Sequence, residues 1–403
     1  MRVLLGWELG GNSGHLRRLG DIASCLVARG HEVHLALQRP TTIRLPAAWR
    51  DRIDLWQAPV WPGLWRSDGT RPLGEARAFG DVLANLGLQS ADVFRGLLRA
   101  WDGILAAVRP DAVVANFAPA LVAGARGRIA RIVVGTGFTV PPTDGPVFPL
   151  FPGEEAPRLV AEEALLALVN RAMAGLGRSP LGRLPELFAA EAELPAVFHE
   201  LDPHAAHRHE EPLPPFLPAD LDAGAEKPPA PGRAEAVFAY LPASGLPLGA
   251  IDLLVALSRR MRVGAVVPGL DRDRAAQLVA AGVALSEHPR DWPGIRRDHG
   301  FMLCAGGMGT VSSALVTGLD LAILPGGIEQ RLTARAAAAA GLGLDLGAMR
   351  EPPERLADII AARAADADRR GAVRERARSF RARAGDPASV VASRIDAMLR
   401  RNS

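Results

Sequence analysis

Two short apolar runs near residue 300, each followed by a glycine-rich turn, constrain the fold of this chain more than any other feature. The runs Phe301–Cys304 and Leu321–Leu324 are bounded by turn-forming residues and have the length of buried strands. A helix-compatible segment lies between them, so the order is strand, turn, helix, strand. Strands that are connected through a helix run parallel in one sheet. The stretch therefore predicts an α/β domain built on a parallel sheet.

The turns after these two strands are suited to bind an anion. The first turn places four residues at the start of the expected helix: Gly306, Gly307, Gly309 and Thr310. Unpaired backbone N–H groups and the helix dipole attract negative charge at such a position. The second turn leads to Glu329 and Gln330, a carboxylate beside an amide that can bind hydroxyl groups. Together the turns predict a nucleotide-diphosphate site; the alternative is two ordinary turns and a solvated helix start.

The first 40 residues show the same order of elements. An apolar run at Val3–Trp7 ends in the glycine-rich turn 10–15. Leu16–Ala28 then carries apolar residues at helical spacing, and Glu32–Leu37 is typical of the next strand. This pattern predicts a second doubly wound parallel sheet. The turn lacks a G-x-G-x-x-G fingerprint, and Gln38 stands where a dinucleotide-binding domain has an acidic residue, so hydride transfer is disfavoured.

His15 is the residue of this turn that can carry acid–base chemistry. It stands at the C-terminal end of a strand, where a helix begins, and a helix N-terminus lowers the pKa of an imidazole. A general base at pH 7 has to be neutral, as such an imidazole is. The alternative is a histidine that only caps its own turn, and the sequence leaves both interpretations open.

Composition narrows the classes of partner. Of 403 residues 23% are charged, the formal net charge is +3, and no long basic block is present. Nucleic acid is therefore not expected as a partner, whereas an anionic small molecule or a peripheral contact with an anionic membrane fits. Cys25 and Cys304 are too few for a disulfide framework or a metal cage, which favours a reducing cytoplasm. Without a secretory signal or an apolar run of about 18 residues, we expect a cytoplasmic protein with no transmembrane helix.

The domain organisation follows from a change in composition after residue 205. Eight prolines lie between Pro203 and Pro231, which is typical of a semi-rigid linker. A new alternation of strands and helices begins after it. We expect four parts: an N-terminal domain at 1–205, a linker at 206–233, a C-terminal domain at 234–385, and a final helix at 386–403 that packs back toward the N-terminal domain.

Tryptophan residues cluster between positions 49 and 65, although aromatic residues make up only 5% of the chain. Trp61 and Trp65 of this cluster, with Phe138 in a loop at a strand end, are candidates to line an apolar cleft for a ligand. The alternative is that the tryptophans pack a loop onto the sheet. The sequence does not decide between the two.

Two segments resemble the GT-B glycosyltransferases of the family 1 type, which include the macrolide and UDP-glucuronosyl transferases. The segment 6–33, GWELGGNSGHLRRLGDIASCLVARGHEV, is similar to the opening strand, loop and helix of that family. The segment 304–330, CAGGMGTVSSALVTGLDLAILPGGIEQ, is similar to its donor signature. The resemblance covers nearly the whole chain. It implies two Rossmann-like doubly wound domains that face each other across a cleft, with the acceptor on the N-terminal domain and the nucleotide sugar on the C-terminal one.

The resemblance assigns roles to individual residues. His15 falls on the catalytic base and Asn116 on its partner, while Glu329 and Gln330 fall on the pair that holds the sugar hydroxyls. The nucleobase is expected near His288 and Pro289. The resemblance implies donor and phosphate contacts for ten residues: Gly11, Asn12, Ser13, Gly14, Ser244, Gly306, Gly307, Met308, Gly309 and Thr310.

Three positions depart from the family pattern. Ala305 stands where the family has a histidine that contacts the donor phosphate. In this respect the loop is also similar to that of the peptidoglycan lipid-linked N-acetylglucosaminyltransferase, but Ser313 stands where that enzyme has a glutamate that reaches the ribose. Asn116 occupies the position at which related enzymes often have an aspartate.

The implied activity is a single inverting displacement. A hexose-type sugar moves from UDP or TDP to a hydroxyl of a small apolar acceptor, with no metal ion and no cofactor besides the nucleotide sugar as co-substrate. One alternative is a non-catalytic nucleotide-sugar binding protein. Another is a GT-B-type nucleotide-sugar 2-epimerase, which needs carboxylates in the cleft and for which Glu8 and Glu329 are the candidates.

Overall fold

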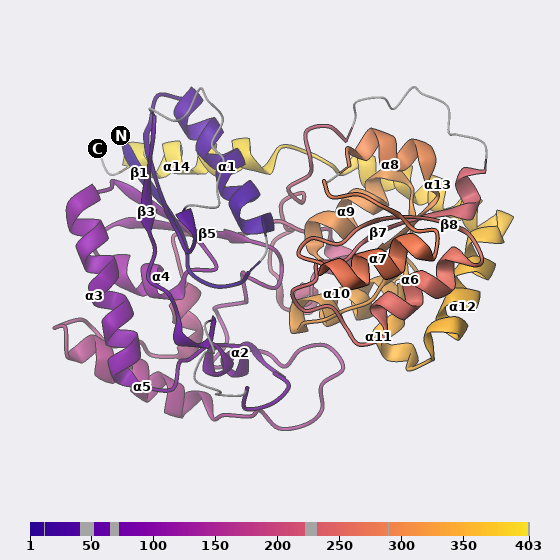
Figure 1. The fold of residues 1–403 in the computed structure, drawn as a ribbon. Helices are drawn as coiled ribbons and strands as arrows, with labels where there is room; N and C mark the ends of the chain where they lie inside the picture. Colours follow the sequence, from indigo (N-terminus) through magenta and orange to yellow (C-terminus); the bar gives the residue numbers. More distant parts are fainter. Residues whose placement is uncertain (12, 41–51, 65–71, 222–231, 289, 402–403) are drawn as a thin grey trace. The chain divides into compact units, whose positions relative to one another are not determined.

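The computed structural model describes residues 1–11, 13–40, 52–64, 72–221, 232–288 and 290–401, and it divides the chain into two compact units (Figure 1). Unit 1 comprises Met1–Leu213 and Asp386–Ser403. Unit 2 comprises Pro214–Gly385. The boundary thus falls within the segment expected as a linker, and the C-terminal segment belongs to unit 1.

Unit 1 contains a parallel sheet with the strand order β3-β2-β1-β4-β5-β6. Its strands are β1 (Arg2–Trp7), β2 (Glu32–Leu37), β3 (Ile53–Gln57), β4 (Ala112–Asn116), β5 (Ala130–Gly135) and β6 (Ala192–Pro195). The central strands are almost entirely buried, as expected for a parallel sheet that is covered on both faces. Because the chain order reverses between β1 and β4, the carboxyl ends of these two strands form the switch point at which α/β sheets bind ligands.

The helices of unit 1 include one from the far end of the chain. They are α1 (Ser13–Ala28), α2 (Phe79–Asn85), α3 (Ala91–Val108), α4 (Pro119–Ala125), α5 (Glu162–Ala174) and α14 (Pro387–Arg401). α14, drawn in yellow, lies beside the indigo α1 (Figure 1). Asp396 of α14 accepts hydrogen bonds from Arg29 (2.8 Å) and His31 (2.8 Å). These contacts attach the last helix to the first βα unit.

Unit 2 repeats the architecture with the strand order β12-β11-β10-β7-β8-β9, again all parallel. Its strands are β7 (Ala236–Tyr240), β8 (Arg262–Val266), β9 (Ala284–Leu285), β10 (Phe301–Cys304), β11 (Asp320–Ile323) and β12 (Leu344–Asp345). Its helices are α6 (Ala250–Ser258), α7 (Arg272–Ala280), α8 (Trp292–Asp298), α9 (Met308–Thr317), α10 (Ile328–Ala339), α11 (Leu346–Met349), α12 (Pro353–Ala365) and α13 (Ala367–Ala382). β7, β10 and β11 are neighbours, so their carboxyl ends lie together at one edge.

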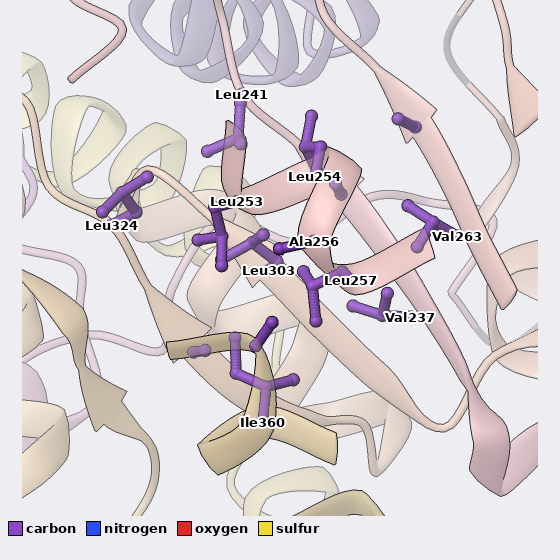
Figure 2. Packing of buried hydrophobic residues seen from close by; sticks show 14 of the residues in the cluster. Val237, Leu241, Leu253, Leu254, Ala256, Leu257, Val263, Leu303, Leu324 and Ile360 are labelled. Carbon is purple, nitrogen blue, oxygen red and sulfur yellow. The ribbon is translucent and has the colours of Figure 1, made fainter. Parts of the chain in front are cut away.

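Buried apolar side chains of helices and strands pack together in unit 2 and hold the strands of its sheet in position (Figure 2). Leu253 and Leu257 of α6 pack with Leu303 of β10 and Val263 of β8, and Ile360 of α12 completes the cluster. All five side chains are buried. Burying each one contributes about 1.5–3 kcal/mol. Alternate residues of a strand face opposite sides of the sheet, so the burial of Leu303 on this face sets the orientation of β10 and of the turn that follows it.

The architecture agrees with the α/β prediction: both sheets are parallel, and helices alternate with strands along the chain. Among the described residues, the structure contains no helix that is long and apolar enough to cross a membrane.

Candidate active site

His15 is held by a hydrogen bond to the end of β4. It lies in the first turn of α1, and its Nδ1 is 2.6 Å from Oδ1 of Asn116, the last residue of β4. β1 and β4 pair in parallel up to Trp7 and Asn116, so the end of β4 lies beside the point where the turn toward α1 begins. The structure therefore brings together the two residues to which the sequence assigned base and partner.

The orientation of Asn116 fixes which nitrogen of His15 carries the proton. Nδ2 of Asn116 donates to the carbonyl of Val134 at 2.7 Å, so Oδ1 faces the imidazole. An amide oxygen can only accept, and Nδ1 of His15 is therefore the donor. Nε2 keeps its lone pair and is the nitrogen that can accept a proton from another molecule.

Two aromatic rings pack against the imidazole. Trp7 stacks on it with a centroid distance of 5.1 Å and an interplanar angle of 14°, and Phe117 lies 6.2 Å away at 27°. Phe117 adopts a φ of 50°, which is uncommon for a residue with a side chain, and its carbonyl accepts a hydrogen bond from Leu9 at 3.0 Å. The strained turn after β4 thus joins the turn after β1, and together they hold the ring in one orientation.

His15 is neutral at physiological pH in this environment. The pKa of His15 is lowered to about 3, mainly by burial and also by the nearby Arg18 guanidinium, while the hydrogen bond to Asn116 opposes the shift. Nη1 of Arg18 lies 3.5 Å from the same Asn116 oxygen. Nε2 of this imidazole is therefore unprotonated across the whole neutral range.

Gly10 keeps the space next to Nε2 open. A Cβ atom at this position would lie 2.6 Å from Nε2 of His15, and the backbone there has a φ of 84°, which favours glycine. The sequence placed Gly10 in the turn but gave it no role. No spacing rule indicates that the missing side chain would meet the histidine.

The other residues of this turn lie at the start of α1. Gly11 and Gly14 are exposed, and a Cβ atom at either position would meet nothing within 4 Å. Ser13 begins the helix. Asn12 lies outside the described residues.

Glu8 belongs to the core of unit 1. Its carboxylate accepts four hydrogen bonds, from Nε1 of Trp61 (2.8 Å), Nε1 of Trp101 (2.7 Å) and the backbone N–H groups of Ala120 (3.1 Å) and Leu121 (2.6 Å). Burial raises the pKa of Glu8 to about 7, while the hydrogen bonds oppose this shift. All four partners are donors only, so their geometry favours the ionised carboxylate.

Of the two interpretations of the tryptophan cluster, loop packing describes Trp61. Its side chain has no exposed surface, and its only polar atom is bonded to Glu8. Phe138 is also buried, with ring centroids 5.3 Å from Phe79 and 5.9 Å from Phe151. In this structure neither side chain offers a surface to a ligand. The structure thus places the apolar area of both in the core of unit 1; Trp65 lies outside the described residues.

In unit 2, three loops meet at the carboxyl ends of β7, β10 and β11. Gly306 has a φ of 91°, and a Cβ there would lie 2.7 Å from Ile323 and 3.1 Å from the carbonyl of Gln330. A Cβ on Gly326 would collide with the carbonyl of Gly245, next to the exposed Ser244. Only glycine permits these close approaches. The loops that the sequence predicted to form one donor site therefore lie against one another.

The start of α9 offers backbone donors. The first hydrogen bond within the helix runs from Val311 N–H to the carbonyl of Gly307 at 3.0 Å, so the N–H groups of residues 307–310 have no partner in the helix itself. Gly309 is exposed and Thr310 is half-buried, whereas the side chain of Met308 is buried. The first turn holds no acidic residue. The arrangement can bind an anion through backbone groups and the helix dipole.

Gln330 uses its oxygen within the protein. Oε1 accepts from the N–H groups of Gly326 (2.7 Å) and Gly327 (3.1 Å) and caps α10. Only its Nε2 group could donate to a sugar hydroxyl. Glu329 is half-buried in the first turn of the same helix.

His288, the expected nucleobase contact, is exposed, and its carbonyl accepts a hydrogen bond from Ser286 at 2.9 Å. Pro289 lies outside the described residues. Within the described part of the chain, no group of three or more His, Cys, Asp or Glu side chains is placed to hold a metal ion.

No family model and no curated protein sequence matches this chain, whereas solved structures match nearly its whole length. The calicheamicin glycosyltransferase CalG4 is 19% identical with a TM-score of 0.68, over 99% of this chain and 98% of that one. The glycosyltransferase VinC, in complex with DTDP, is 16% identical with a TM-score of 0.64, over 100% of both chains. A UDP-glucosyltransferase from Polygonum tinctorium is 15% identical with a TM-score of 0.62, over 99% of this chain and 98% of that one.

The chain has the GT-B fold. Two six-stranded parallel sheets, each within its own α/β unit, are what these glycosyltransferases share with it. The fold that the sequence resemblance implied is confirmed.

Proposed function

We propose that this protein is an inverting glycosyltransferase that moves a hexose-type sugar from UDP or TDP to a hydroxyl of a small apolar acceptor. The contact between His15 and Asn116 carries the proposal, because it leaves Nε2 of a neutral imidazole able to accept a proton. The GT-B fold supports it, as do the printed names of the structural neighbours, which are glycosyltransferases.

The proposed reaction is one displacement at the anomeric carbon. Nε2 of His15 takes the proton of the acceptor hydroxyl while the oxygen forms a bond to C1 of the sugar. The bond from C1 to the diphosphate oxygen breaks, and its electron pair leaves with the nucleotide diphosphate. Attack from the face opposite the leaving group inverts the anomeric configuration. A positioned base of this kind contributes about 10²–10⁴-fold to the rate.

Unit 2 is proposed to hold the donor. The N–H groups of residues 307–310 and the dipole of α9 would stabilise the charge that develops on the leaving diphosphate, and this stabilisation needs no metal ion. Glu329 and the Nε2 group of Gln330 would hold sugar hydroxyls. The complex of VinC with DTDP supports thymidine diphosphate as one nucleotide to try.

The test is to compare wild type with His15→Ala for sugar transfer and for nucleotide binding. Transfer is expected to fall by about 10²–10⁴-fold, whereas the affinity for TDP or UDP stays within about twofold, because His15 lies in unit 1 and acts on the acceptor. Gly306→Val is the converse control, since its side chain would displace Ile323 and the Gln330 backbone and weaken nucleotide binding. A His15→Ala variant that keeps more than about a tenth of the activity would contradict the role of the base.

The epimerase alternative loses one of its two candidate carboxylates. Glu8 is buried and engaged by four donors, so it has no access to a substrate. Nucleotide binding without transfer to any acceptor would instead favour the non-catalytic binding protein.

A further inference from the structure

The polar surroundings of His15 disfavour its protonated form. Its Nδ1 donates to an amide oxygen, and the other end of this amide is engaged by the carbonyl of Val134. No carboxylate therefore stands at this position to stabilise an imidazolium. Arg18, one turn further along α1, brings a positive charge to within 3.5 Å of the same Asn116 oxygen. Both features make a cation at His15 costly.

The groups on the neighbouring elements do not offset this. Trp7 of β1 and Phe117 after β4 contact the ring with uncharged aromatic faces. Glu8 of the same turn directs its carboxylate into the core, toward two indoles and the start of α4. Asp21, further along α1, faces Arg17 at 4.0 Å and also attracts the Arg18 guanidinium, but it does not act on the pKa of His15. Among the described residues, the side chains that contact the imidazole or act on its charge are thus neutral or positive, which suits an anion better than a cation.

Because His15 is a weak base in these surroundings, it can activate only some kinds of hydroxyl group. An aliphatic alcohol has a pKa of about 16, near that of water, and it needs a base that holds the proton well in the transition state. A phenol has a pKa of about 10, so it loses its proton far more easily.

We propose that the acceptor nucleophile is an acidic hydroxyl, a phenol or an enol, and that Asn116 and Arg18 together set this preference. The inference rests on the proposed function and specifies its acceptor. In the transfer step the acidic O–H gives its proton to Nε2 of His15 late or only partly, and the oxygen attacks C1. The electron pair of the C1–O bond leaves with the nucleotide diphosphate, and His15 then passes its proton to water. Asn116 and Arg18 act through His15 and are positioning residues.

The test uses the full-length protein with TDP-glucose or UDP-glucose and two acceptors of similar shape, 2-naphthol and 2-naphthalenemethanol. Wild type is expected to favour the phenol in kcat/KM by about 100-fold or more. Asn116→Asp places a carboxylate beside Nδ1. It should reduce the preference for the phenol about tenfold, because kcat/KM for the alcohol rises. It should also raise the pKa of His15, measured by NMR titration. Asn116→Asp could fail to fold, because its carboxylate would face the Val134 carbonyl. Arg18→Gln is the second variant for that case: it removes the positive charge and should reduce the preference for the phenol in the same way.

The outcomes separate the inference from the function on which it rests. Equal or faster transfer to the alcohol by wild type overturns the acceptor assignment and leaves glycosyl transfer standing. An unchanged ratio in both variants overturns the role of Asn116 and Arg18. If the protein binds TDP or UDP but transfers sugar to neither acceptor, the acceptor assignment fails, whereas the proposed function fails only when no other hydroxyl acceptor is glycosylated either.

Discussion

At the scale of single residues, the orientation of the candidate base His15 depends on side chains that also belong to the core of unit 1. His15 is fixed by Asn116 and Trp7, and the turn that carries it is joined to the next turn through Leu9 and Phe117. One residue away from Trp7, Glu8 locks the same turn to α3, α4 and the loop that holds Trp61. The positions of the candidate base and its partner are therefore set by hydrogen bonds within unit 1.

Glu8→Gln should destabilise unit 1. The new amide would place its N–H₂ group against an indole N–H and a backbone N–H, which leaves donors facing donors in a buried site. We expect a loss of about 2–4 kcal/mol in the free energy of unfolding, measured by urea denaturation. Glu287→Gln, an exposed position of the same chemistry, should change it by less than about 0.5 kcal/mol. Equal, small effects of both substitutions would show that Glu8 is not held as a carboxylate.

His204 makes stability depend on pH. Burial lowers the pKa of His204 to about 3, helped by the nearby Arg208, and neither ring nitrogen has a hydrogen-bond partner among the described residues. Between about pH 6.5 and pH 3 the unfolded chain binds a proton here and the folded chain does not, so stability falls as the pH is lowered through this window.

His204→Leu should remove this contribution. The difference in unfolding free energy between wild type and variant should change by about 2 kcal/mol from pH 6.5 to pH 5, in favour of the variant at the lower pH. His204→Phe keeps a ring next to Phe151 and should behave in the same way. Parallel stability curves for wild type and both variants would refute the assignment.

The sequence indicated candidates for the residues that would carry chemistry, but not the residues that position them. His15 and the glycines at 306, 307 and 309 followed from residue type and strand-end position, whereas Asn116 followed from the family resemblance. Gly10, Arg18 and Phe117 acquire their roles only from contacts across three segments. Trp61 was ambiguous, because a tryptophan packs equally well in a cleft or in a core.

At the scale of elements, the start of α9 carries the anion-binding hypothesis. Its backbone N–H groups follow a turn of glycines, and the Gly306 contact holds that turn against the start of α10. Strand and helix positions here agree with the pattern of apolar runs, because each run was the full length of a buried strand. The use of the Gln330 oxygen as a cap was not visible in the sequence, since an amide can serve a helix or a ligand equally well.

Gly309→Asp tests the α9 site with a matched control. The position is exposed, and a Cβ there meets nothing within 4 Å, so a side chain fits. A carboxylate should repel the diphosphate and weaken TDP binding at least about tenfold in calorimetry, whereas Gly309→Asn should stay within about threefold. The aspartate also favours the helix itself by about 0.3–1 kcal/mol, so the loss cannot be ascribed to unfolding. Equal affinity of the two variants would place the anion elsewhere.

At the scale of the whole molecule, the C-terminal helix α14 belongs to unit 1, the unit formed by the N-terminal half of the chain. α14 lies against α1 although more than 350 residues separate the partners Arg29 and Asp396. Val391, Ile395 and Leu399 of α14 are buried. The last helix therefore contributes to the fold of the unit that carries His15.

Ile395→Ala should destabilise unit 1 by about 2–4 kcal/mol, because it leaves a cavity under α14. Differential scanning calorimetry would measure this, with Arg394→Ala at an exposed neighbouring position as the control. Binding of TDP should change little, since the proposed diphosphate site at the start of α9 lies in unit 2. A variant that unfolds like wild type would show that α14 adds little to unit 1.

Calorimetric titration of the full-length protein with TDP and with UDP, without added metal ion, tests the central claim most directly. We expect at least one of them to bind in the micromolar range and Gly309→Asp to weaken this binding. If neither nucleotide binds even at millimolar concentration, the loops at the ends of β10 and β11 are not a diphosphate site, and the proposed glycosyl transfer is contradicted.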